Sequence, residues 1–284
     1  MNSLRNRIRV LPSHKKMASP IRMRQGVYLL PNLVTSGGLF CGFYSVIATL
    51  REDYLTAAIA VLIAQVFDAL DGRVARMTKT SSHFGIEYDS LSDVIAFGVA
   101  PGVLAYRWAL EPWGPWGWLA ASLYVICGAL RLARFNVQVE VVDRHSFVGL
   151  PIPAAAGVVA TTILMYYFLG GEGATNKHIT LLLLIYILAV LMVSNIRYYS
   201  FKDLHLGHRQ PFWILLLGIV LIQLTIAEPQ IMLFSIFSLY ALSGPVWALW
   251  RLWRRTPLAE TAAEPQSLPR PYTRPLDNEE KSSL

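Results

Sequence analysis

The 284-residue sequence has few charged residues and almost no cysteine. Charged residues make up 15% of the chain, whereas hydrophobic residues make up 54%. A soluble globular domain of this length needs a more charged surface, so the composition excludes that class and indicates an integral membrane protein. The two cysteines, Cys41 and Cys127, both lie within apolar runs. They exclude a disulfide framework and are typical of small core residues.

The two ends of the chain lack the pattern of a cleaved leader and that of a folded domain. Residues 1–27 are basic, but no short apolar core with a small-residue cleavage site follows them. We therefore expect a basic cytoplasmic N-terminal arm, not a signal peptide, and nothing in it requires a nucleic-acid partner. Residues 256–284 are rich in Pro, Glu and Ser and have no apolar periodicity. This composition predicts a disordered cytoplasmic tail.

Eight apolar stretches approach the length of about 20 residues that a transmembrane helix requires. They are approximately Leu29–Leu50, Tyr54–Met77, Tyr88–Leu110, Trp116–Phe135, Ile152–Leu169, Ile179–Ile196, Phe212–Ala227 and Ile231–Trp250. The predicted fold class is therefore an all-α integral membrane protein with eight transmembrane helices.

The distribution of lysine and arginine predicts the orientation in the membrane. With the N-terminus inside, 22 of the 25 basic residues fall in cytoplasmic segments, and Arg51, Arg107 and Lys177 are left for the far side. Because positive residues are enriched in cytoplasmic loops, we expect both termini to be cytoplasmic. The net charge of +7 is explained by this topology, with contact to anionic lipid as a second interpretation.

Four carboxylates lie in two pairs within the segment DALDGRVARMTKTSSHFGIEYDSLSD. Asp68 and Asp71 are three residues apart, and Asp89 and Asp93 are four apart. In helices each pair lies on one face, and a short polar loop between the helices lets the pairs face one another. Four acids beside a membrane repel one another unless cations lie among them, which predicts a site for divalent cations such as Mg²⁺ or Mn²⁺. The alternative interpretation is a set of structural ion pairs with Arg73 and Arg76.

Small and basic residues beside these acids favour phosphoryl chemistry. Gly72 leaves the backbone next to Asp71 open to a bulky ligand, and Ala75 lies on the same helix face. Arg76 offers a fork of donors suited to phosphate oxygens, and Gly85 permits a tight turn into the third helix. Cations and an arginine together indicate binding of a diphosphate.

The pattern D-x2-D-G-x2-A-R-x8-G-x3-D-x3-D resembles the signature of the CDP-alcohol phosphotransferases. Every position of the signature is matched between Asp68 and Asp93. The resemblance implies a six-helix membrane core over residues 28–205 with a cytoplasmic active site. Residues 206–255 then form a two-helix C-terminal extension, and a homodimer in the cell (inner or plasma) membrane is expected.

The resemblance also implies roles for individual residues. Two divalent cations, Mg²⁺ or Mn²⁺, are expected on Asp68, Asp71, Asp89 and Asp93, with Asp93 also the general base. Gly72, Arg76 and Ser82 are expected to contact the CDP-lipid. The segment PNLVT resembles a further family element, in which Asn32 and Thr35 face the nucleotide. A plain helix start, with Thr35 bonded to backbone, explains that segment equally well.

Three further stretches, CGALRLARFNVQ, FVGLPIPAAAG and MVSNIRYYSFKD, resemble the phosphatidylserine synthase branch of that family, in its integral membrane form. This resemblance implies transfer of a phosphatidyl group from CDP-diacylglycerol to L-serine. Arg131 and Arg134 are suited to hold a carboxylate, and Asn136 to add a hydrogen bond. The alternative for both arginines is a role as anchors on the cytoplasmic side.

Two other functions stay open at this point. One is the same chemistry with another acceptor, such as glycerol 3-phosphate, inositol phosphate or choline. The other is a cation transporter, although a transporter places its acids near the bilayer midplane on broken helices. The clustering of the acids at one end of their helices favours the enzyme.

Overall fold

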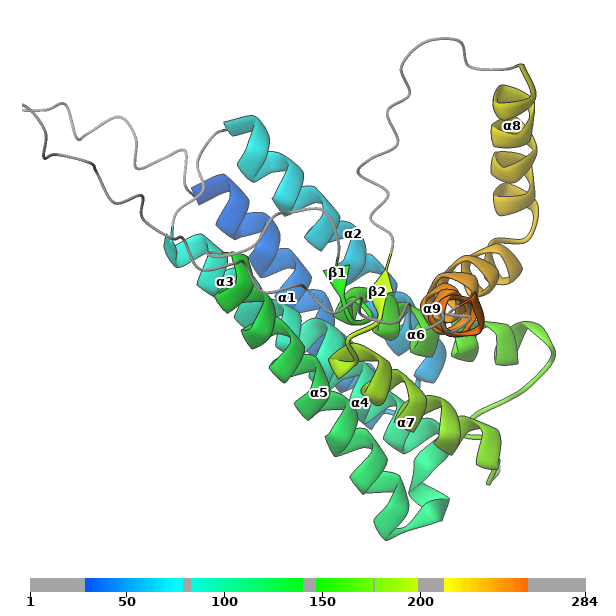
Figure 1. The fold of residues 1–284 in the computed structure, drawn as a ribbon. Helices are drawn as coiled ribbons and strands as arrows, with labels where there is room; N and C mark the ends of the chain where they lie inside the picture. Colours follow the sequence, from blue (N-terminus) through cyan, green and yellow to red (C-terminus); the bar gives the residue numbers. More distant parts are fainter. Residues whose placement is uncertain (1–28, 79–82, 140–146, 176, 199–211, 255–284) are drawn as a thin grey trace, which may run out of the picture.

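The computed structural model describes residues 29–78, 83–139, 147–175, 177–198 and 212–254, which are almost entirely helical (Figure 1). The predicted N-terminal arm, Ser82 and the predicted tail lie outside these residues. The helices and strands are α1 (Leu29–Leu50), α2 (Tyr54–Thr78), α3 (His83–Asp93), the π-helix η2 (Val94–Val99), α4 (Ala100–Ala105), the π-helix η3 (Tyr106–Leu110), the 3₁₀-helix η4 (Glu111–Trp113), α5 (Pro115–Val139), β1 (Phe147–Val148), α6 (Ile152–Phe168), α7 (Ile179–Val193), β2 (Arg197–Tyr198), α8 (Phe212–Ala227) and α9 (Pro229–Arg254).

The prediction of an all-α, multi-pass membrane protein is confirmed. In the described part of the chain, five helical segments are long and apolar enough to cross a membrane: Leu30–Leu50, Tyr54–Met77, His83–Trp113, Pro115–Val137 and Pro229–Arg251. The other three predicted spans are also helices, but α6, α7 and α8 have 17, 15 and 16 residues and are shorter than a typical span. The helix lengths therefore do not test the three shorter crossings, and the count of eight stays a prediction.

The third helix begins earlier than its apolar stretch indicates. It starts at His83, not near Tyr88, because polar residues continue the helix beyond the apolar zone that hydropathy detects. Gly85 consequently lies in the first turn of α3, and it is absent from the described glycines with positive φ. The prediction of a tight turn at Gly85 was therefore wrong.

Close backbone contact sets the position of this third segment against α1. A Cβ atom at Gly42 would lie 2.6 Å from the Cα atom of Ala96 in η2. Helix α1 also packs along α2 and contacts α3, and Figure 1 shows these three helices side by side. Because η2 follows Asp93 directly, the contact at Gly42 holds the end of α3 against the middle of α1.

The hydroxyl of Tyr124 takes the place of a backbone donor that Pro101 lacks. Pro101 lacks the N–H group that would reach the carbonyl of Phe97, four residues earlier. Tyr124 of α5, which is fully buried, donates its hydroxyl to that carbonyl at 3.1 Å. The bond ties α5 to the irregular segment that follows Asp93, so both elements form one wall of the core.

Two prolines shape the start of α6. Pro151 is the N-cap of α6, and Pro153 lies in its first turn. The small residues Ala154 to Gly157 are buried, as expected for close helix packing. The short antiparallel pair β1–β2 joins the chain before α6 to the chain after α7, with Phe147 opposite Tyr198.

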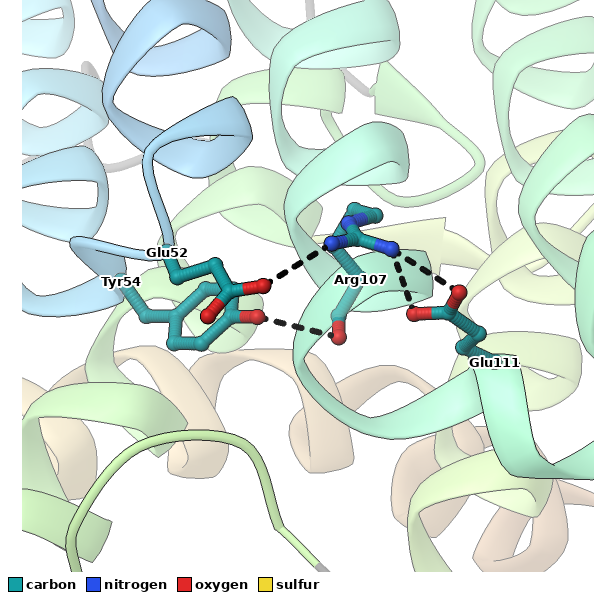
Figure 2. A network of polar contacts seen from close by, with 4 residues as sticks. All are labelled: Glu52, Tyr54, Arg107 and Glu111. Atoms are coloured by element: carbon teal, nitrogen blue, oxygen red, sulfur yellow. Dashed lines mark hydrogen bonds and ion pairs between the residues drawn. The ribbon is translucent and has the colours of Figure 1, made fainter.

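A polar clamp closes the end of the bundle where α1 meets α2 (Figure 2). Arg107 forms ion pairs with Glu111 at 2.7 Å and with Glu52 at 3.2 Å. The hydroxyl of Tyr54 donates to the carbonyl of Arg107 at 3.4 Å. All of these side chains are remote from the acidic pairs, because Glu52 follows the C-terminal end of α1, whereas Thr35 near the N-terminal end contacts Asp71.

Candidate active site

Three of the four predicted acids converge in the structure. Asp68 and Asp71 lie in the last three turns of α2, and Asp89 lies on α3. One carboxylate oxygen from each can be chosen so that all three atoms lie within 4.8 Å of one another. Asp71 is 6% exposed, and the other two are half-buried. The two helices thus bring together carboxylates that are distant in sequence.

Asp93 lines the same recess without joining the tight group of three. The recess has an empty volume of about 180 Å³. Its lining residues are Thr35, Gly38, Ala64, Asp68, Asp71, Asp89, Ser92, Asp93, Ala96 and Phe97. All four predicted acids therefore face one recess among α1, α2, α3 and η2.

The charges in this recess need a counterion. Two unit charges 4 Å apart repel by roughly 4 kcal/mol at an effective dielectric constant of about 20. Within the described residues, the ion pairs involve Arg107 and none of these acids. Arg73 and Arg76 are exposed and form no ion pair with them, so the alternative of structural ion pairs with these two arginines is not supported.

The donor set fits a hard divalent cation. Carboxylate oxygens are the ligands that Mg²⁺ and Mn²⁺ prefer, and three of them already lie close together in a partly buried place. A divalent cation would replace the repulsion by attraction to every carboxylate. The geometry therefore agrees with the predicted metal ligands Asp68, Asp71 and Asp89, with Asp93 beside them.

Thr35 has the backbone contact of a plain helix start and also contacts one of the acids, while its role as a nucleotide contact stays a prediction. Its hydroxyl lies 3.1 Å from the carbonyl of Pro31, as in a plain helix start, and 2.9 Å from Oδ2 of Asp71. Thr35 is buried, and its own carbonyl accepts the hydroxyl of Ser92 at 3.3 Å. Asn32 is half-buried, and its carbonyl accepts the hydroxyl of Ser36 at 2.8 Å. The contact of the Asn32 side chain with the nucleotide stays a prediction.

Sequence reasoning missed two polar residues around the recess. Ser92 lines it directly, and its position three residues after Asp89 places both on one helix face. Tyr88 on α3 forms a hydrogen bond of 2.8 Å with Ser36 on α1. Both residues join α3 to neighbouring residues of α1, Thr35 and Ser36. Their sequence signal is weak, because serine and tyrosine are common at helix ends for other reasons.

The residues expected to contact the CDP-lipid lie at the outer end of α2. A Cβ atom at Gly72 would meet only the Nη1 atom of Arg76, at 4.0 Å, so the space beside Gly72 is open. Arg76 is exposed in the last turn of α2, and Ala75 is half-buried. This agrees with the expected approach of a bulky ligand at Gly72, while Ser82 lies outside the described residues.

The three predicted acceptor residues do not converge on one point. Arg131 is 9% exposed and interacts electrostatically with Asp93, although no direct ion pair joins them. Arg134 instead donates to the side chain of Asn195 at 2.9 Å, and Asn136 donates to the hydroxyl of Ser90 at 3.0 Å. Arg131 and Arg134 thus have different surroundings, and the expectation that both hold one carboxylate stays a prediction.

Comparison with known proteins agrees with this geometry. The CDP-alcohol phosphatidyltransferase family model matches residues 28–200, from the start of α1 to just beyond β2. A CDP-diacylglycerol–serine O-phosphatidyltransferase of Helicobacter pylori is 48% identical over 179 residues, which cover 62% of this chain and 74% of that protein. An archaetidylserine synthase of Methanothermobacter thermautotrophicus is 39% identical over 171 residues, covering 60% of this chain and 69% of that protein.

A third relative covers most of a shorter protein. A CDP-diacylglycerol–serine O-phosphatidyltransferase of Bacillus subtilis is 34% identical over 173 residues, which cover 61% of this chain and 91% of that protein. The family match spans well over half of the chain and includes all four acids of the recess. The chain belongs to the CDP-alcohol phosphatidyltransferase family.

Proposed function

We propose that the protein transfers the phosphatidyl group of CDP-diacylglycerol to the hydroxyl of L-serine, giving phosphatidylserine and CMP. The serine oxygen bonds to the lipid-side phosphorus while the bond from that phosphorus to the bridging oxygen of CMP breaks. The hydroxyl proton passes to Asp93. The serine-specific names of the relatives in Helicobacter pylori and Bacillus subtilis support this acceptor over the other alcohols of the family.

The observation that carries the proposal is the recess in which Asp93 lies beside the three converging carboxylates. Arg131 is buried and interacts electrostatically with Asp93 without a direct ion pair. Serine has a hydroxyl and a carboxylate a few bonds apart. Its hydroxyl therefore fits Asp93 while its carboxylate takes the guanidinium of Arg131, which forms bidentate pairs with carboxylates. Arg134 and Asn136 would border the acceptor and not hold its carboxylate.

Direct displacement is favoured because the acidic motif from Asp68 to Asp93 offers no obvious covalent nucleophile. Thr35 donates to Asp71 or Pro31, and Ser92 donates to the carbonyl of Thr35. These hydrogen bonds give both hydroxyls a structural role between α1, α2 and α3. We therefore expect a single step with inversion at phosphorus.

The remaining functions are the binding of the cations and the binding of the CDP moiety. Asp68, Asp71, Asp89 and Asp93 would hold two divalent cations, Mg²⁺ or Mn²⁺, which when bound polarise the diphosphate and stabilise the departing CMP. Gly72, Arg76, Asn32 and Ser82 would contact the CDP moiety. Thr35 orients Asp71 in this scheme through its hydrogen bond.

We place the recess and both termini at the cytoplasmic face of the cell membrane. Arg51, Arg107 and Lys177, the three basic residues predicted for the far side, lie near the helix ends remote from the acids. This agrees with the charge distribution of the whole sequence. The family resemblance also leads us to expect a homodimer.

The test is release of CMP by the purified full-length protein in detergent–lipid micelles with CDP-diacylglycerol. Serine, glycerol 3-phosphate, inositol phosphate and choline are compared as acceptors, each with Mn²⁺, with Mg²⁺ and with EDTA. We expect release that requires serine and a divalent cation. Metal-dependent release with another alcohol would overturn the serine assignment but keep the chemistry. Ion flux in proteoliposomes without CMP release would favour a transporter.

A further inference from the structure

Helix α9 lies outside the family match, which ends at residue 200, yet it packs against the matched region. Figure 1 shows α9 beside α6 and β2, and these are its main contacts in the matched region. Most of its described side chains are exposed or half-buried, whereas Ala241 and Gly244 are buried. The buried residues therefore mark the side of α9 that faces the bundle.

The first anchor of α9 is a phenylalanine on a glycine. Phe237 packs on Gly157 of α6 so closely that a Cβ atom there would overlap the phenyl ring. The three residues before Gly157 are buried alanines, which keep the surface of α6 flat. A large aromatic ring seated in such a notch fixes both the height and the rotation of α9.

The second anchor is Tyr198 of β2. Its ring lies over Gly244, and its hydroxyl donates to the carbonyl of Ala241 at 3.1 Å. Pro245, four residues after Ala241, has no N–H to offer that carbonyl, so the tyrosine supplies the missing donor. Burial, together with the neighbouring Tyr240, raises the pKa of Tyr198 to about 12, so the hydroxyl remains a donor at neutral pH.

These anchors fix the part of α9 that carries Tyr240, which precedes Ala241 and lies against Tyr198. The rings of Tyr240 and Tyr198 lie 5.6 Å apart, which restrains the ring of Tyr240. Arg131 interacts electrostatically with Asp93 on α3 and with Tyr240 on α9. The Nε atom of Arg131 is buried and has no hydrogen-bond partner among the described residues. The guanidinium of Arg131 is therefore held in a buried place but keeps an unused hydrogen-bond donor.

We propose that Tyr240 is a positioning residue for Arg131, and that α9 thereby completes the acceptor subsite. This inference rests on the proposed function, in which Arg131 holds the carboxylate of serine. The phenolic oxygen carries partial negative charge and attracts the guanidinium away from Asp93. Without it, Arg131 is free to turn and pair directly with Asp93, which closes the space for the acceptor.

Tyr240→Phe isolates this role, because phenylalanine keeps the ring beside Tyr198 and removes only the oxygen. Initial rates of CMP release are measured against serine and against CDP-diacylglycerol in separate series with the full-length protein. We expect the KM for serine to rise roughly three- to tenfold, the effect of losing one hydrogen bond or similar polar contact. The KM for CDP-diacylglycerol and the melting temperature should stay unchanged. In an Arg131→Lys background the same substitution should raise the KM for serine much less.

Tyr186→Phe is the control, since it makes the same chemical change on α7, away from the recess, where the hydroxyl of Tyr186 donates to the carbonyl of Trp116. An unchanged KM for serine in Tyr240→Phe, with an active wild-type protein, would overturn this inference alone. Equal rises in both KM values, or a lower melting temperature, would show a merely structural role and overturn it as well. Absence of serine-dependent release by the wild-type protein would instead overturn the proposed function, and this inference with it.

Discussion

Thr35 on α1 donates a hydrogen bond to Asp71 on α2, with 2.9 Å between Oγ1 and Oδ2. Both residues are buried, and Asp71 belongs to the group of three carboxylates. The bond orients one lone pair of the carboxylate and leaves the other oxygen for a cation. A residue from outside the acidic segment thus takes part in the site.

Thr35→Val should weaken metal binding while keeping the fold. Valine has a similar shape but offers no donor, so Asp71 loses its fixed orientation. Loss of such an outer partner typically lowers metal affinity about 10- to 100-fold. Titration of Mn²⁺ followed by electron paramagnetic resonance measures the change without any need for turnover.

Thr49→Val is the control for that substitution. Thr49 is also a buried threonine of α1 and bonds to the carbonyl of Ser45 at 2.8 Å, but it lies at the opposite end of the helix. It should leave Mn²⁺ affinity unchanged. Equal affinities in wild type and Thr35→Val would show that the hydrogen bond does not support the metal site.

Asp93→Asn should abolish turnover and keep the protein folded, because the amide preserves shape and lacks basicity. General-base catalysis typically contributes about 10²- to 10⁴-fold, so CMP release should fall by at least that range. Asp53→Asn makes the same chemical change at the start of α2, where Asp53 accepts the backbone N–H of Thr56. Normal rates are expected there, and normal rates in Asp93→Asn would remove the proposed base.

Divalent cations should stabilise the protein against heat. A ligand that binds only the folded state adds about 2.7 kcal/mol at a concentration 100 times its Kd. Mn²⁺ should therefore raise the melting temperature in detergent, and EDTA should reverse the rise. In Asp89→Asn, which removes one of the three converging carboxylates, the rise should shrink or disappear. A full Mn²⁺ effect in that variant would place the cation elsewhere.

Arg131→Ala should raise the KM for serine far more than the KM for CDP-diacylglycerol. Arg131 faces Asp93, whereas Arg134 is bonded to Asn195, so Arg134→Ala should have the smaller effect. Arg107→Ala removes an arginine of the remote clamp and should change neither constant. Its partly exposed ion pairs contribute about 0–1 kcal/mol each to the free energy of unfolding. A larger serine effect in Arg134→Ala would reverse the assignment.

Gly157→Ala should displace α9, because the new methyl group occupies the place of the Phe237 ring. Overpacking of this kind typically costs about 1–3 kcal/mol of stability. We expect a lower melting temperature and a raised KM for serine. Adding Phe237→Leu should restore part of both by making room. A double variant no better than Gly157→Ala would show that Phe237 is not the group displaced.

The site was predictable where it depends on local periodicity. Asp68 and Asp71 share a helix face by their spacing, and a short connection brings Asp89 opposite them. The start of α3 was misplaced because its polar first turns give no hydropathy signal, and η2 was not foreseen because π-helices leave no simple pattern.

The sequence by itself determined the membrane class, the helical segments and the four acids, because apolar runs and fixed spacings act within one or two helices. Tertiary structure alone decided which distant residues meet. It gave Arg131 and Arg134 different surroundings, bonded Thr35 to Asp71 and brought Tyr240 of α9 against Tyr198 of β2. Such contacts depend on how helices rotate and pack, as at Gly157 and Gly244, and packing is a property of the assembled bundle that no single stretch of sequence contains.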